Sequence, residues 1–209
     1  MKNIVTIELG DFTYKLNTKD KTASVMGGKA YKKELVIPPS IKYEKKEYTV
    51  TSIHNCTFKD EDIGCGHHEF TDTSVESISI PASVINIDEI WCEDTAKLTA
   101  IKIDPGNQYY SYFDDKFIIG KSDIANDFDV LIFARRDIVE GTIPPFIKII
   151  GPYAFAHCNK LQKLIIPQNS QLKQIGRGAF NYSSIADFKI PKFVKLIDRT
   201  AFDHCPLST

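Results

Sequence analysis

The sequence predicts a curved α/β solenoid, with a parallel β-sheet on its concave face and short helices on its convex face. Two observations predict this class. The dipeptide Ile-Pro, once replaced by Ile-Asp-Pro, recurs through the 209 residues with proline-to-proline steps of 43, 24, 39, 23 and 24. Apolar residues also return at fixed distances around each proline. A unit that cannot bury its own apolar side buries it by stacking on its neighbours.

The stretch before each proline predicts a short strand. Apolar residues there alternate with others, as in Val75 to Ile80 and Leu161 to Ile166, which is typical of a β-strand. Proline then ends the strand because it has no N–H for the ladder. Identical strands stacked at one period would form the parallel sheet.

The stretch after each proline predicts the opposite, convex side. Gly151 to Cys158 is interpreted as one or two helical turns, with Pro152 near the helix start. Three apolar columns run through these segments and are expected to form the core. They are Val50, Val84, Ile147, Leu172 and Val194; Ile53, Ile87, Ile150, Ile175 and Ile197; and Phe58, Cys92, Phe155, Phe180 and Phe202.

Two irregular stretches complete the predicted organisation of a single domain spanning residues 1–209. Residues 1–34 contain alternating runs that indicate a β-hairpin cap over the first repeat. Residues 109–134 interrupt the period and are interpreted as an inserted β-hairpin, between repeats at 35–108 and 135–209.

The composition excludes several classes of protein. With 26 Lys and Arg against 27 Asp and Glu, the net charge is −1, which lacks the basic surface of a nucleic-acid binder. No run of 18 apolar residues is present, so membrane insertion is not expected. Five cysteines spread through the chain do not indicate a disulfide framework. The first residues reach Glu8 before any apolar signal region forms, so no signal peptide is expected in this chain.

The repeat pattern resembles the BspA-like (bacterial surface protein A-like) leucine-rich repeat. Residues 143–167 match its pattern Ile-Pro-x-x-apolar-x-x-Ile-Gly-x-x-Ala-Phe-x-x-Cys-x-x-Leu-x-x-Leu-x-Ile-Pro almost position by position. Residues 172–202 match it well, whereas residues 75–105 depart from it at Trp91-Cys92 and Ile103-Asp-Pro. Phe12 to Tyr14 and Tyr48 to Ile53 are similar to the family's lead-in.

The resemblance implies a leucine-rich-repeat solenoid that binds proteins, without a cofactor and without catalysis. Such repeats are typical of surface proteins of host-associated bacteria and trichomonad-type protists. The leading hypothesis is therefore a cell-surface or extracellular adhesin, or a fragment of one, with a protein partner such as a host surface or matrix protein. The alternative is an intracellular, cytoplasmic scaffold of the same fold. An enzyme is disfavoured because no nucleophile–base–orienter set is recognisable.

The outward row of the predicted sheet is the main candidate binding surface. Residues four and two before each proline alternate with buried ones and must point away from the core, and solenoids bind partners on such strips. This row comprises Glu34, Val36, Ser77, Ser79, Glu140, Thr142, Lys163, Ile165, Asp187 and Lys189, and Ala100 and Lys102 fill it in the third repeat, which is shifted by one residue relative to Pro105. A second candidate is the aromatic group Tyr109, Tyr110, Tyr112 and Phe113, for which packing of the insertion is an alternative.

Other chemistry-bearing groups are interpreted as structural. His54, Cys56, Cys65, His67, His68 and Glu69 lack the spacing of a zinc site, so no metal is expected. Asp60 to Asp62 and Asp114-Asp115 lack the order of a calcium loop. The couples His157-Cys158 and His204-Cys205 share one repeat position, which favours stacking over nucleophilic catalysis. Asn55 and Asn181 lie in N-glycosylation acceptor patterns.

Two expectations concern the last repeats. Cys158 and Cys205 lie two repeats apart, farther than a disulfide spans, so both should be reduced. No strand pattern follows residues 185–190, so their outer edge is expected to be unpaired, with self-association through the C-terminal end or a longer array as the two explanations.

Overall fold

A computed structural model of the chain describes residues 3–28, 32–54, 74–89, 91–93, 95–125 and 127–207. The chain divides into two compact units, Met1–Gln108 and Tyr109–Thr209, and each is considered by itself. The prediction that the whole chain folds as one domain stays a prediction.

The first unit begins with three antiparallel strands in the stretch predicted to cap the repeats. β1 (Ile4–Leu9), β2 (Phe12–Asn17) and β3 (Thr22–Gly28) pair in that order. β3 then pairs in parallel with β6 (Lys46–Ile53), which also takes β5 (Ser40–Tyr43) antiparallel and β8 (Asn86–Ile87) parallel.

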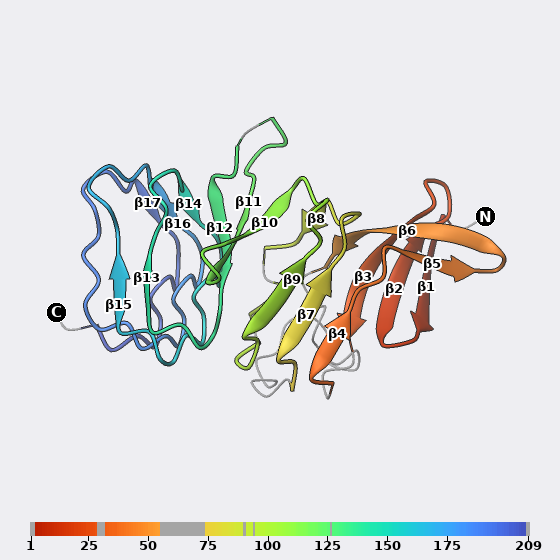
Figure 1. Cartoon of the computed structure of the whole chain (residues 1–209), viewed down its shortest axis with the longest axis horizontal. Helices are drawn as coiled ribbons and strands as arrows, with labels where there is room; N and C mark the ends of the chain where they lie inside the picture. The colour runs from red at the N-terminus through yellow and green to blue at the C-terminus, as the bar shows by residue number, and fades with distance from the viewer. Residues whose placement is uncertain are drawn as a thin grey trace. The chain divides into compact units, whose positions relative to one another are not determined.

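A second sheet of the first unit contains the strands that precede the prolines. β4 (Glu34–Val36), β7 (Ser77–Ile80) and β9 (Ala100–Ile103) are parallel and adjacent (Figure 1). Leu35, Ile78 and Ile101 point inward and are at most 5% exposed. The strand pattern before each proline is thus confirmed here.

The second unit has the same two kinds of sheet. One contains the antiparallel strands β10 (Tyr110–Phe113), β11 (Phe117–Gly120) and β12 (Val130–Ala134), continued in parallel by β14 (Ile149–Ile150), β16 (Gln174–Ile175) and β17 (Leu196–Ile197). The other pairs β13 (Glu140–Thr142) with β15 (Lys163–Ile165) in parallel (Figure 1).

The segments expected to form convex-face helices are tight turns, so the α/β assignment is wrong. The described ranges contain no helix. Tyr153 and His157 have φ values of 54° and 56°, in the left-handed region that an α-helix does not use. Equivalent positions in the next two repeats, Gly178, Tyr182, Thr200 and His204, are left-handed as well.

Backbone hydrogen bonds between repeats explain why turns replace helices. The N–H groups of Tyr153, Phe155 and His157 donate to carbonyls of the next repeat over 2.7–3.0 Å. In an α-helix they would donate to the residue four positions back. The amide of Ala154, which lies between two of them, donates instead to the carbonyl of Gly151, three residues back. Every second amide of the segment therefore forms its hydrogen bond with the next repeat and not within the segment.

Most described members of the predicted apolar columns are buried in the core. Phe155 and Phe180 are fully buried, and their rings stack at a centroid distance of 4.9 Å and an angle of 10°. Phe202 stacks on Phe180 at 5.0 Å. Cys92 occupies the same column in the first unit and is fully buried, whereas Phe58 lies outside the described residues. Ile197, in the last described repeat, is 41% exposed.

We expect Phe180→Ala to lower the free energy of unfolding by about 3–5 kcal/mol, because it removes the middle ring of a close-packed stack. Urea denaturation followed by circular dichroism measures the change. Lys163→Ala, on an exposed position of β15, is the control and should change stability by less than about 0.5 kcal/mol. Unfolding of Phe180→Ala at the wild-type urea concentration would contradict the core described above.

Gly178→Ala distinguishes the turn from the helix that the sequence suggested. In a helix this change would stabilise the protein by about 1 kcal/mol. Gly178 instead has φ +57°, and an added Cβ would lie 2.5 Å from the ring of Tyr153. We therefore expect a loss of about 1–3 kcal/mol in thermal or urea unfolding. A more stable variant would show that the turn geometry is incorrect.

Candidate protein-binding surface

The outward row of the first unit is aligned by the register of its parallel strands. Glu34, Ser77 and Ala100 are neighbours in one column, and Val36, Ser79 and Lys102 in the next. Glu34, Val36, Ala100 and Lys102 are exposed, and the two serines are half-buried. The face is small and polar, with Val36 exposed over 59% of its surface.

The outward row of the second unit is more charged. The register places Glu140 beside Lys163 and Thr142 beside Ile165. All four are exposed, and Ile165 is 44% exposed. Two further predicted members, Asp187 and Lys189, are also exposed but belong to no strand.

Most charged side chains on these rows form no ion pair within the described part of the protein. Lys102, Glu140, Lys163, Asp187 and Lys189 make no ion pair with another described residue. Elsewhere charges are paired, as in Lys33–Glu76 at 2.8 Å. A face with unpaired charges and an exposed isoleucine can supply both electrostatic and apolar contacts.

Each unit also has an open hollow where these strands end in Ile-Pro. The hollow of the first unit measures about 620 Å³ and is lined by Ile37, Pro39, Ser79, Ile80, Pro81, Ala82, Ser83, Lys102, Ile103, Asp104 and Pro105. That of the second measures about 450 Å³ and is lined by Lys163, Leu164, Ile166, Pro167, Gln168, Asp187, Lys189, Ile190, Pro191, Lys192 and Phe193. Sequence reasoning missed Lys192 and Phe193, although their place directly after Ile190-Pro191 was a usable signal.

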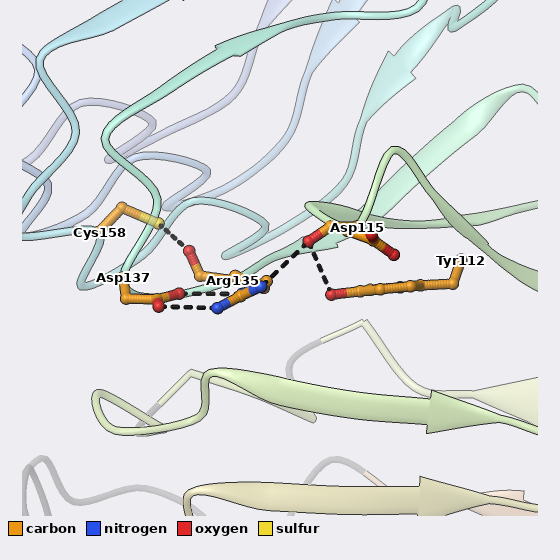
Figure 2. Close-up of polar contacts among 5 residues, drawn as sticks. All are labelled: Tyr112, Asp115, Arg135, Asp137 and Cys158. Atoms are coloured by element: carbon orange, nitrogen blue, oxygen red, sulfur yellow. Dashed lines mark hydrogen bonds and ion pairs between the residues drawn. The ribbon is translucent and has the colours of Figure 1, made fainter.

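The aromatic group before the insertion packs within the second unit. Tyr110 is 8% exposed, and the rings of Phe113 and Phe146 meet edge-on at 5.7 Å. The Tyr112 hydroxyl donates to the Asp115 carbonyl at 3.0 Å (Figure 2), and burial raises the pKa of Tyr112. These contacts favour a packing role for Tyr112 and Phe113 over partner binding; Tyr109 is half-buried.

Arg135 fixes the turn between β10 and β11. Its Nε and Nη2 donate to both carboxylate oxygens of Asp137, at 3.0 and 2.8 Å, and its Nη1 lies 3.4 Å from the Asp115 carbonyl (Figure 2). The hydrogen bond to Asp137 raises the pKa of Arg135. The thiol of Cys158 lies 3.7 Å from the Arg135 carbonyl oxygen. Asp115 and its neighbour Asp114 thus belong to a structural turn.

The group of histidines and cysteines that begins at His54 is only partly described by the structure. Of its residues, His54 is described, and its Nε2 lies 3.5 Å from the Asp88 carboxylate. Cys56, Cys65, His67, His68 and Glu69 lie outside the described residues, as do Asp60 to Asp62 and Asn55. The parts of the chain that the structure does describe contain no group of three or more His, Cys, Asp or Glu able to hold a metal.

The paired histidines and cysteines occupy stacking columns. The rings of His157 and His204 stack on Tyr182, at 5.4 and 4.2 Å. Cys158 is buried, and the Cys205 thiol donates to the Phe180 carbonyl at 2.9 Å. Cys158 and Cys205 form no disulfide, as expected from the separation of their repeats, and neither does Cys92.

The described glycosylation pattern is partly buried. Asn181 is half-buried, and its side-chain Oδ1 is buried without a hydrogen bond. Ser183, the hydroxyl residue of the same pattern, is 3% exposed.

Stacked units of a strand, an Ile-Pro turn and a left-handed turn around a phenylalanine column define a leucine-rich-repeat protein. More narrowly, the chain belongs to the BspA-type leucine-rich repeat family, whose model matches residues 32–128 and 122–208 with six copies. No curated protein matches the sequence. Within the described residues, none of the structure forms a helix long and apolar enough to cross a membrane.

Several solved structures of leucine-rich repeat proteins are similar to this chain at low sequence identity. A leucine-rich cell surface protein from Faecalibacterium prausnitzii A2-165 is 17% identical with a TM-score of 0.52, over 98% of this chain and 54% of that one. The pneumococcal vaccine antigen PcpA is 23% identical with a TM-score of 0.49, over 96% of this chain and 48% of that one. A leucine-rich repeat protein from Bacteroides ovatus ATCC 8483 is 24% identical with a TM-score of 0.45, over 91% of this chain and 37% of that one. The chain therefore spans about half or less of these proteins.

The thiols give a test of the cysteine environments. We expect Cys92 and Cys158 to resist alkylation until the protein unfolds, because both are fully buried. Burial raises the pKa of the Cys205 thiol, so less thiolate is present at a given pH. Its alkylation should accelerate at a higher pH than that of a free cysteine. Peptide mapping by mass spectrometry checks each site, and a Cys158–Cys205 bridge would contradict the stacking.

Proposed function

We propose that this chain is a non-enzymatic protein-binding module that takes its partner on the outward row of the strands preceding the prolines. The observation that carries the proposal is the second-unit row: Glu140, Lys163, Asp187 and Lys189 are exposed and unpaired among the described residues, beside the exposed Ile165. Membership of a repeat family whose members typically mediate protein interactions supports it.

We further propose that the module works at a cell surface, as an adhesin or part of one. The supporting likeness is of fold only: a structurally similar chain is described as a leucine-rich cell surface protein. A protein partner on a host surface or in the matrix fits this role, and no nucleic acid is expected because the net charge is −1.

An intracellular scaffold is the second candidate, and the state of the cysteines favours it. Cys92, Cys158 and Cys205 form no disulfide, as is usual in a reducing compartment. Labelling intact source cells with a membrane-impermeant reagent separates the two: the surface protein would be labelled without lysis, and the scaffold only after it.

The binding face is tested with a double variant, Lys163→Glu with Ile165→Asp. Immobilised wild type, the variant and Lys173→Glu are compared for capture of host-surface and matrix proteins. Lys173 is an exposed lysine outside the outward row, so it controls for the change of charge. We expect the double variant to lose capture by about tenfold or more, as for a central interface position, and the control to retain it. Equal capture by all three proteins would exclude this face.

A further inference from the structure

The hollow of the second unit lies where pairing between repeats stops. The Ile37 N–H donates to the Ser79 carbonyl at 3.0 Å, and the Ile143 N–H to the Ile165 carbonyl at 2.9 Å. The next bond in this series would run from Ile166 to Lys189, and it is absent. Within the described part of the chain, no backbone bond joins β15 to residues 185–190.

β15 therefore has a free edge facing the hollow. Its residues Lys163 and Ile165 pair with β13, so the backbone N–H and C=O of Leu164 point to the other side. An unpaired strand edge is a template for another extended chain. Leu164 itself lines the hollow, so an extended segment lying there reaches this edge.

The rim of the hollow is positively charged. Lys163, Lys189 and Lys192 line it together with one carboxylate, Asp187, and all four side chains are exposed. None of the four forms an ion pair with a described residue. Such a rim attracts carboxylates and repels cationic segments.

The lining between the lysines is apolar. Ile190 is 48% exposed and Phe193 is 39% exposed, and both line the hollow with Ile166. An exposed aromatic ring beside an isoleucine is suited to burying one apolar side chain of a partner. A sulfated glycan would use the lysines but neither this apolar surface nor the strand edge.

The equivalent hollow of the first unit shows that the charge is not a property of the repeat. There one lysine, Lys102, accompanies one carboxylate, Asp104. In that sheet the strands that line the hollow are paired with one another, since β7 pairs with both β4 and β9. The first unit thus offers a comparable hollow without the excess positive charge and without a loss of pairing between its lining strands.

We propose that the second-unit hollow binds an extended acidic segment of a protein partner. Carboxylates of the segment meet Lys189 and Lys192, one apolar side chain packs on Ile190 and Phe193, and its backbone adds to the free edge of β15. This inference rests on the proposed function and specifies the partner's chemistry.

The test uses a fluorescein-labelled peptide that alternates aspartate with leucine, with binding followed by fluorescence anisotropy. Lys189→Glu with Lys192→Glu should weaken binding by about tenfold or more, and added salt should weaken it too. Lys173→Glu, at an exposed lysine outside both the hollow and the outward row, is the control and should bind like wild type. Circular dichroism melting establishes that each variant is folded.

Three further probes examine the individual contacts. A peptide with lysine in place of aspartate should not bind. A peptide with N-methylated central amides should bind more weakly, because it lacks the N–H groups that would donate to the free edge of β15. Phe193→Ser should weaken binding without changing its salt dependence. Failure of the aspartate peptide to bind, equal binding by the lysine peptide, or stronger binding of a heparin fragment would overturn the proposal.

The outcome is separable from that of the proposed function. If the Lys163→Glu, Ile165→Asp variant loses partner capture while the aspartate peptide does not bind wild type, the outward row is a binding face and the acidic-segment inference is wrong. If the peptide binds through Lys189 and Lys192 but no variant affects capture, the proposed function is wrong and the partner assignment falls with it.

Discussion

The rest of this structure depends on backbone hydrogen bonds that run from one repeat to the next. The amides of Phe155 and Phe180 each donate 2.7 Å bonds to the following repeat. These bonds set repeats apart by about the 4.8 Å separation of strands in a sheet. That spacing places the phenylalanine rings at 4.9 and 5.0 Å, which suits face-to-face packing. Core packing and backbone pairing are therefore satisfied by one geometry.

The sequence predicted the stack and its core but not the form of the turns. The columns could be predicted because burial of Ile150, Phe155 and Ile175 requires only that repeats superimpose, and the period shows this directly. The helix predicted for Gly151 to Cys158 was wrong because the prediction used only local sequence preference. Hydrogen bonds to the next repeat outweigh that preference and hold Tyr153 and His157 in left-handed geometry. Gly178, which occupies the position of Tyr153 in the next repeat, was a local indication of a left-handed turn.

For the outward row, too, the sequence predicted one property and not another. Alternation along a strand predicts that Lys163 and Ile165 point away from Leu164, and their exposure agrees with this. Alternation does not say where pairing ends, because residues 185–190 carry the same pattern as the paired strands. The repeat therefore does not predict that pairing stops beside β15, although the place of Lys192 and Phe193 directly after Ile190-Pro191 did indicate that these two residues line the hollow. Whether the row binds a partner stays a prediction.

The left-handed turns also constrain how such a chain can change its length. In each turn, alternate backbone amides donate to the next repeat, as at Phe155, and the amides between them donate within the turn, as at Ala154. Loss of a single residue would exchange these two sets of amides, so that every later amide of the turn would point away from its acceptor. Loss or duplication of an entire repeat would join equivalent positions and keep each amide facing its acceptor. Evolutionary variation should therefore occur in whole repeats, with single-residue insertions restricted to stretches outside the ladder.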